Sequence, residues 1–251
     1  MAGHSKWKNI QRRKNAQDAK RGKVFMRLAK ELFIAAKEGG GDPEMNPSLR
    51  LVIDKAKAAN MPNENIDRAI KKATGTLEGV SYEEILYEGY GPGGVAVMVE
   101  VVTDNKNRSA AEIRHAFSKH GGNLGESGCV SFMFDRKGLL VIEKDMVKMD
   151  EDELMLEIID AGAEELEPHE ETFEIYTELD QFSNVKEILL DKGFSFSNAE
   201  ITRIAQTMTQ LKKEEALRML ALIDLLEEND DVQEVYHNLE IDEKVYEEYL
   251  S

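Results

Sequence analysis

The chain has 251 residues, with 49 acidic and 32 basic side chains and a formal net charge of -17. Its single cysteine excludes an intrachain disulfide framework and favours a reducing compartment, so we expect a cytoplasmic protein. No apolar run approaches the roughly 20 residues that span a bilayer, and the basic N-terminus lacks the apolar stretch of a secretory signal. The length allows one large domain or two to three small ones, with no membrane partner.

The first 30 residues differ sharply in charge from the rest. They contain ten Lys or Arg and one acid, Asp18, whereas the other 221 residues contain 22 basic and 48 acidic side chains. A basic head on an acidic body is the layout expected of a protein that binds a polyanion at one end. Residues 1–21 show almost no apolar periodicity, so we expect a mobile basic arm that becomes ordered on binding.

The cations of this head are the candidate binding residues. We predict that they neutralise phosphates and release counterions, and that the one aromatic residue among them stacks on a base. A merely solvated tail is the alternative, but a protein with an acidic excess has no need of a basic segment for solubility. The predicted nucleic-acid-binding residues are Lys6, Trp7, Lys8, Arg12, Arg13, Lys14, Lys20, Arg21, Lys23, Arg27 and Lys30.

Three amphipathic helices follow the arm and form a predicted bundle over residues 22–79. The first ends at Gly39-Gly40-Gly41, the second begins near Asn46-Pro47, and the third begins near Pro62. In the first helix the apolar residues recur every three or four positions, and the cations fall on nearly the opposite face. We therefore expect the bundle and the arm to face the polyanion together.

Strands and helices alternate after residue 79. Residues 80–136 have a ββαβ pattern, with one strand predicted at Cys129–Phe134, and they lack a second helix to cover their sheet. Residues 137–205 have the βαββαβ pattern of a ferredoxin-like unit. A helix at Lys213–Glu228 and a last strand remain, so we predict that residues 206–251 complete the first α/β domain. The predicted fold class is α+β: a three-helix bundle followed by two α/β domains, one inserted in the other.

The inserted domain is strongly acidic. Its segment from Asp145 to Asp180 contains 15 acids and one Lys. We predict a solvated face that repels nucleic acid and so turns the bundle toward it. Docking on a basic protein surface is the alternative for this segment.

Two glycine- and asparagine-rich segments invite an anion-binding interpretation. The turn at Gly89–Gly94 could present amides to a phosphate, although joining two strands is the expected role. The helix after Asp104 could receive an anion at its N-terminus, although capping by Asn105 or Asn107 is the expected role.

The sequence offers little for catalysis or metal chemistry. His115, His120 and Cys129 make no convincing ligand set, and the histidines are widely scattered. We predict no metal site, no cofactor, no small-molecule substrate and no enzymatic activity. A separate hypothesis concerns His4: once Met1 is removed, the terminal amine, two amides and this imidazole form a nitrogen set suited to Cu(II) or Ni(II).

The sequence contains several long, distinctive strings: MAGHSKW, DAKRGKVF, the EGGGDPxxNPxLR stretch at Glu38–Arg50, NMPNENIDRAIKKATG, YEGYGPGGVAVMVEVVTDNKNR and the stretch Arg114–Phe134. Together these strings resemble the YebC/PmpR family. The resemblance implies three domains, a helical bundle and two α/β domains of which one interrupts the other. It implies a DNA-binding transcriptional regulator, since bacterial members are commonly described so. Mitochondrial relatives act as translational activators, and bacterial members are also tied to ribosomes stalled on proline-rich sequences.

These observations predict a non-enzymatic, cytoplasmic nucleic-acid-binding regulator of gene expression. The first hypothesis is a DNA-binding transcriptional regulator, as the resemblance implies. The alternative is a ribosome-associated translation factor that binds ribosomal or transfer RNA through the same arm and relieves stalling on proline-rich sequences. The arm favours RNA mildly, because cations around one aromatic are typical of segments that fold on RNA and no helix-turn-helix pattern is evident. A protein-interaction scaffold with an acidic partner is a weaker third hypothesis.

Overall fold

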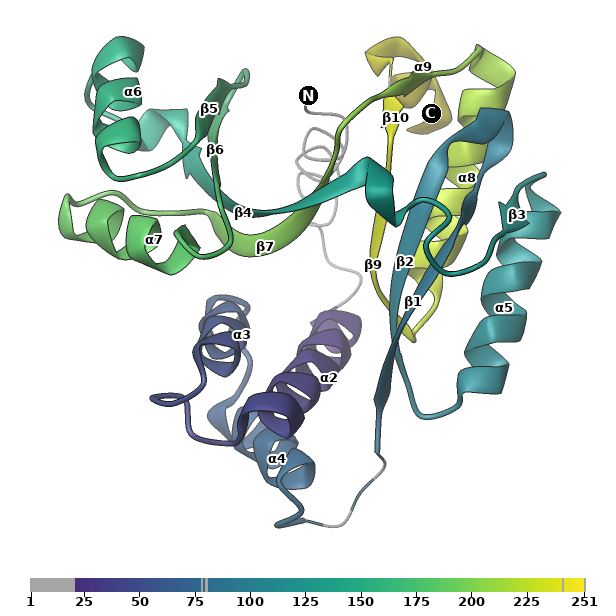
Figure 1. Ribbon diagram of the computed structural model, residues 1–251, viewed down its shortest axis with the longest axis horizontal. Helices are drawn as coiled ribbons and strands as arrows, with labels where there is room; N and C mark the ends of the chain where they lie inside the picture. The colour runs from purple at the N-terminus through teal and green to yellow at the C-terminus, as the bar shows by residue number, and fades with distance from the viewer. Residues whose placement is uncertain (1–20, 78, 80, 241, 251) are drawn as a thin grey trace. The chain divides into compact units, whose positions relative to one another are not determined.

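The computed structural model of the protein describes residues 21–77, 79, 81–240 and 242–250 (Figure 1). One compact unit comprises the described residues up to Met133 together with those from Ala205 onward, and the other is Phe134–Ile204. The predicted fold class is confirmed: helices come first, and two α/β parts follow, one inserted in the chain of the other. The boundaries predicted for the individual domains stay a prediction. None of the described helices is long and apolar enough to cross a membrane.

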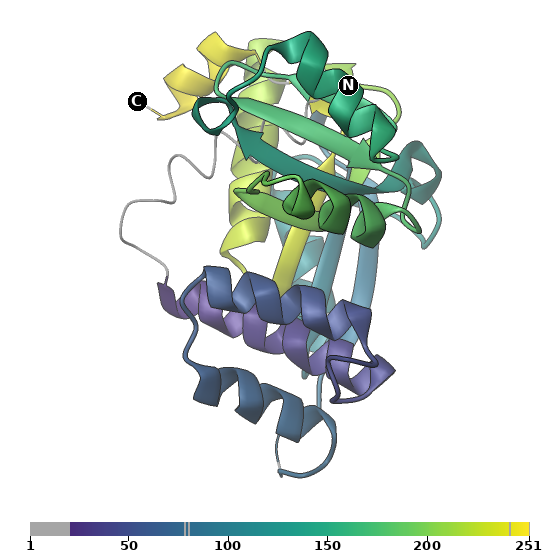
Figure 2. The same cartoon turned by 90° about the vertical axis from the view of Figure 1, so that its left-hand side faces the viewer.

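The N-terminal bundle consists of α2 (Arg21–Gly39), α3 (Pro47–Ala58) and α4 (Asn63–Ala73). Helix α2 packs against both of the others, as Figure 2 shows in purple and blue. Apolar side chains form the core of the bundle, because each helix buries the face on which its apolar residues recur every three to four positions. The buried residues are Leu28, Leu32, Ala35, Ala36, Leu49, Val52, Ile53, Ala56, Met61, Ile66 and Ala69.

The side chain of Asn46 links the end of α2 to the start of α3 through hydrogen bonds. Its side-chain oxygen accepts a hydrogen bond from Leu49 N at 3.0 Å and so caps α3. Its Nδ2 donates to Ala35 O and to Gly40 O, both at 2.8 Å. Because the side chain is only 4% exposed, these bonds satisfy polar groups that water does not reach.

The first sheet has the strand order β3-β1-β2-β9, and its neighbouring strands are antiparallel. The C-terminal strand thus pairs with a strand more than a hundred residues earlier, and the inserted unit lies between them in the chain. The same unit also contains a two-stranded parallel sheet, formed by β8 and β10, and a last helix. The elements are β1 (Glu83–Tyr90), β2 (Ala96–Thr103), α5 (Lys106–Lys119), β3 (Asn123–Leu124), β8 (Thr209–Gln210), α8 (Lys213–Glu228), β9 (Val232–His237), β10 (Leu239–Glu240) and α9 (Glu243–Leu250).

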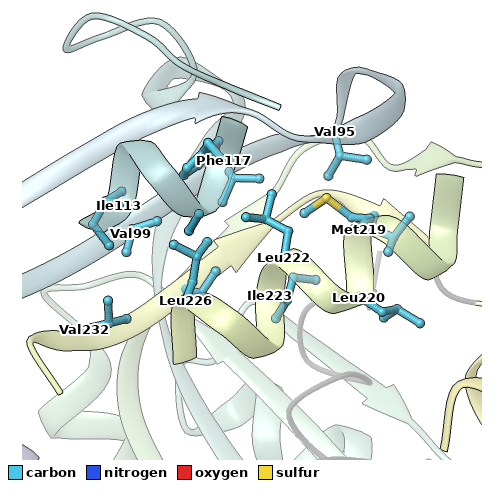
Figure 3. Packing of buried hydrophobic residues seen from close by; sticks show 14 of the residues in the cluster. Val95, Val99, Ile113, Phe117, Met219, Leu220, Leu222, Ile223, Leu226 and Val232 are labelled. Carbon is cyan, nitrogen blue, oxygen red and sulfur yellow. The ribbon is translucent and has the colours of Figure 1, made fainter. Parts of the chain in front are cut away.

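Helices α5 and α8 bury their apolar stripes on the same face of this sheet (Figure 3). Ile113 and Phe117 come from α5, and Leu222 and Leu226 come from α8. Each is at most 1% exposed, as is Val99 of β2 beneath them. Full burial of one such side chain contributes about 1.5–3 kcal/mol, so this layer fixes both helices on the sheet.

The strand predicted at Cys129–Phe134 is wrong. This segment forms a loop and a short 3-10 turn (Ser131–Met133), and β3 lies earlier in the chain. The buried carboxylate of Glu88 explains the difference, because it accepts the amides of Gly128, Val130 and Ser131 at 2.8–2.9 Å. Amides held by a side chain cannot join a strand ladder.

The inserted unit has the predicted ferredoxin-like βαββαβ order. Its sheet runs β5-β6-β4-β7, with β6 antiparallel to both β4 and β5. Apolar residues of α6 and α7 are buried, including Leu154, Ile158, Val185 and Leu189. The elements are β4 (Phe134–Glu143), α6 (Glu151–Asp160), β5 (Glu165–Pro168), β6 (Thr172–Thr177), α7 (Phe182–Asp191) and β7 (Asn198–Ala205).

We expect Asn46→Ala to lower the free energy of unfolding by about 3 kcal/mol, because it removes one helix cap and two buried hydrogen bonds of about 1 kcal/mol each. Asn46→Ser keeps a cap acceptor and loses the two donors, so it should cost less. Urea unfolding followed by far-UV circular dichroism measures both. Equal stability of the wild type and Asn46→Ala would contradict this role.

Candidate nucleic-acid interface

The predicted binding residues fall into two groups. Residues 1–20 lie outside the described part of the chain, and Arg21 is described only as the first residue of α2. The predictions that lie outside it concern Lys6, Trp7, Lys8, Arg12, Arg13, Lys14 and Lys20, the mobility of the arm, and His4. Lys23, Arg27 and Lys30 are described in full on α2, and the structure brings these three together.

Two cations of α2 contact the C-terminal end of α8, and the third contacts the residues just after that helix. Lys23 Nζ donates to Glu228 O, and Arg27 donates to Glu227 O at 2.6 Å. The last carbonyls of a helix lack intrahelical partners and carry the negative end of its dipole. Lys23 and Arg27 therefore cap the C-terminal end of a helix of the same chain. The periodicity of α2 alone did not indicate this arrangement.

Lys30 reaches farthest into the protein. Its Nζ donates to Asp230 O and to Asp231 Oδ1, each at 2.9 Å. It also lies 5.6 Å from the ring centroid of Tyr82, which packs edge-on against Phe33. Lys30 is only 5% exposed, so the structure gives this predicted phosphate contact an internal anionic partner.

Asp231 is the centre of this cluster. Besides Lys30, its carboxylate accepts from Arg108 at 2.6 Å, from Ser109 Oγ at 2.8 Å and from Thr103 Oγ1 at 3.0 Å. Burial by itself raises the pKa of Asp231, but the hydrogen bonds from Arg108, Lys30 and Ser109 outweigh burial and hold that pKa well below its usual range. The carboxylate thus stays charged while its side chain is only 9% exposed.

Asp231 and Arg108 were not singled out from the sequence. Arg108 follows the cap of α5, where Asn105 Oδ1 accepts from Arg108 N at 3.1 Å. The capping predicted for this asparagine is therefore present. The ion pair itself joins residues 123 positions apart, which no local pattern indicates.

Other cations of the bundle point outward. Arg68, Lys71 and Lys72 of α4 are exposed, as the periodicity of that helix predicts. They carry positive charge on the surface of the bundle and have the same side-chain chemistry as the arm, so they offer matched controls for it.

The glycine-rich turn between β1 and β2 uses its amides internally. Gly91 N donates to Val95 O at 2.8 Å, and Gly94 N donates to Gly91 O at 3.1 Å. Gly93 has a φ of 67°, and a Cβ there would lie 2.2 Å from Leu211 Cδ2. The turn joins the strands as expected and packs tightly, so its glycines serve the fold.

Cys129 has the environment of an unreactive thiol. Burial raises its pKa, and the nearby Glu88 carboxylate raises it further. A thiol that stays protonated is a poor nucleophile.

In the same loop, Phe132 is 68% exposed to solvent. The strand predicted for this segment did not indicate that exposure.

Family models match most of the chain. The model described as TACO1/YebC protein N-terminal domain matches residues 5–76, and the model described as TACO1/YebC second and third domain matches residues 82–239. The first match covers the arm from residue 5 and the bundle, and the second covers both α/β parts.

Relatives match along almost the whole chain. A protein of Geobacillus kaustophilus named a probable transcriptional regulatory protein is 68% identical over 248 residues, which are 99% of this chain and 100% of that protein. The probable transcriptional regulatory protein YrbC of Bacillus subtilis is 61% identical over 95% of this chain and 99% of its own. A crystal structure of a conserved hypothetical protein from Aquifex aeolicus superposes with a TM-score of 0.82 at 49% identity, over 90% of this chain and 93% of that chain.

We expect Asp231→Asn to lower the free energy of unfolding by about 3–5 kcal/mol, because it leaves the buried Lys30 without its counter-charge. Asp230→Asn is the matched control, since the Asp230 side chain is 72% exposed and its pair with Lys23 is 3.6 Å long. The control should change stability by less than about 1 kcal/mol. Equal effects of the two substitutions on the free energy of unfolding, measured in urea at pH 7, would contradict the role of Asp231 as the counter-charge of Lys30.

The difference between the wild type and Asp231→Asn should depend on pH. Because folding lowers the pKa of this carboxyl, its contribution is complete above the unfolded-state value of about 4. It is lost as the pH falls below that value toward the folded-state pKa. The unfolding free energies of the two proteins should therefore differ by the same amount at pH 7 and pH 5, and by a smaller amount at pH 3. A constant difference down to pH 3 would contradict the lowered pKa.

Proposed function

Because this chain belongs to the TACO1/YebC family, we propose that it is a nucleic-acid-binding regulator of gene expression. Its relatives in Geobacillus kaustophilus and Bacillus subtilis are named probable transcriptional regulatory proteins, and neither name is that of an enzyme. A cytoplasmic location and the absence of enzymatic activity belong to the same proposal.

One observation directs the proposal to the arm. Lys23, Arg27 and Lys30 are engaged by the end of α8 and by the two aspartates that follow it, so their charge is already partly neutralised. The arm brings a further excess of positive charge, with only Asp18 opposing it. We assign the phosphate contacts to Lys6, Lys8, Arg12, Arg13, Lys14, Lys20 and Arg21.

Duplex DNA is the first candidate ligand, in line with the names of the relatives. An arm of this kind binds the backbone through charge, and phosphate contacts position a protein without reading sequence. Promoter selection by this chain then requires either the shape of the DNA or a protein partner. A basic partner surface could dock on the acidic segment of the inserted unit.

RNA on the ribosome is the second candidate, favoured by Trp7. This residue is the only tryptophan of the chain and stands between Lys6 and Lys8. An aromatic side chain among cations suits unstacked bases of single-stranded or looped RNA, which duplex DNA does not offer. A translation factor that binds ribosomal or transfer RNA would use the arm in this way.

We expect Arg12→Ala/Arg13→Ala/Lys14→Ala to reduce the log–log salt slope of binding to duplex DNA by about 2–3, because each phosphate contact contributes about 0.9. The control, Arg68→Ala/Lys71→Ala/Lys72→Ala on α4, removes the same charge from an exposed helix and should change the slope by less than one. Fluorescence anisotropy of labelled duplex across salt measures both. Equal losses would assign binding to the bundle rather than to the arm.

Trp7 reports on the choice of ligand. Since the chain has one tryptophan, its intrinsic tryptophan fluorescence comes from the arm alone. We expect ribosomal RNA to quench this emission and Trp7→Ala to weaken RNA binding by about 1–3 kcal/mol, with little effect on duplex DNA. Quenching by a promoter duplex, together with a defined footprint, would favour the transcriptional regulator instead. Co-sedimentation with ribosomes after DNase treatment would favour the translation factor.

A further inference from the structure

A cluster of ligating side chains lies on the β5–β6 hairpin of the inserted unit. Glu167 on β5 and Glu174 on β6 are direct cross-strand partners, so their side chains project from the same face of the sheet. The hairpin is closed by His169 N, which donates to Thr172 O at 2.8 Å. This short connection places the imidazole of His169 beside both carboxylates (strands labelled in Figure 1).

The three donor atoms are close together. His169 Nε2 lies 3.0 Å from Glu174 Oε2 and 3.9 Å from Glu167 Oε2. One ligand atom from each residue lies within 4.8 Å of the others. Ligands bound at about 2.0–2.2 Å from a common zinc ion are separated by distances of this order.

The side chains of the cluster have little contact with water, so a charge on them costs free energy. The side chain of Glu174 is fully buried, and those of Glu167 and His169 are 15% and 22% exposed. Two carboxylates that face each other across a strand pair repel, and a cation bound between them would relieve that repulsion.

A divalent cation would give the imidazole of His169 and the two carboxylates one common partner. Tyr176 OH donates to Glu174 Oε2 at 2.8 Å and fixes the orientation of that carboxylate. Such a contact from outside the ligand set is typical of metal sites.

We propose that Glu167, His169 and Glu174 form a binding site for a divalent transition-metal ion, with Zn2+ as the best-matched species. One imidazole and two carboxylates suit Zn2+ or Mn2+, whereas Mg2+ avoids nitrogen ligands. The ion joins β5, an edge strand of the sheet, to β6, and so stabilises the hairpin. The site is separate from the arm, and its occupancy does not require nucleic acid.

The sequence did not indicate this site. His169 stands alone in an acidic run, and the spacing of the three residues matches no zinc motif. Among the described residues, His115, His120 and Cys129 form no such group.

Zinc titration of the full-length protein tests the proposal. The His4→Gln background removes the separate N-terminal nitrogen set, and the protein is first stripped of metal with a chelating resin. We expect calorimetry with zinc chloride to show one saturable equivalent and zinc to raise the thermal midpoint, with magnesium chloride giving neither effect. The absence of saturable zinc binding would overturn the proposal.

Variants then locate the ion. His169→Gln and Glu167→Gln should abolish the saturable equivalent, and Tyr176→Phe should weaken it by about 10- to 100-fold. His115→Gln, the same substitution on the exposed face of α5, should leave it unchanged. Circular dichroism of each variant without metal reports whether it is folded. Undiminished zinc binding by folded His169→Gln would assign the ion elsewhere and refute the site.

Discussion

The structure of the larger unit depends on one buried carboxylate. Asp231, at the start of the last strand of the first sheet, receives hydrogen bonds from Lys30 of the bundle, Arg108 and Ser109 of α5, and Thr103 of β2. A charge with little access to water must be matched within the protein, and these donors come from three separate elements. Their common need for this acceptor fixes the bundle against the α/β part of the same unit.

This arrangement separates two uses of positive charge. The cations of α2 stabilise the fold, because they lie against the carbonyl end of α8 and the acids that follow it. The arm before α2 holds most of the remaining charge of the basic head. Under the proposed function, a polyanion would bind the arm and dissociate from it without breaking the contacts that hold the bundle in place. That proposal assigns folding and binding to separate residues.

The inserted unit, by contrast, has an excess of negative charge. Its acidic run places Glu167 and Glu174 face to face on neighbouring strands. A bound divalent cation would relieve the repulsion between them locally while the surface keeps its negative charge. The same excess of acids thus underlies the proposed cation site, where Glu174 is buried and Glu167 is half-buried.

The sequence by itself determined the class of the fold and most of its longer helices and strands. The helix predicted at Lys213–Glu228 has the observed bounds, and the βαββαβ order of the inserted unit was evident because amphipathic periodicity and turn residues act within a few positions. Tertiary structure alone decided which surfaces those elements share. Lys30 pairs with an aspartate 201 residues later, and Glu88 takes the amides of a segment that looked like a strand. Such contacts follow from packing between distant segments, which local periodicity does not encode.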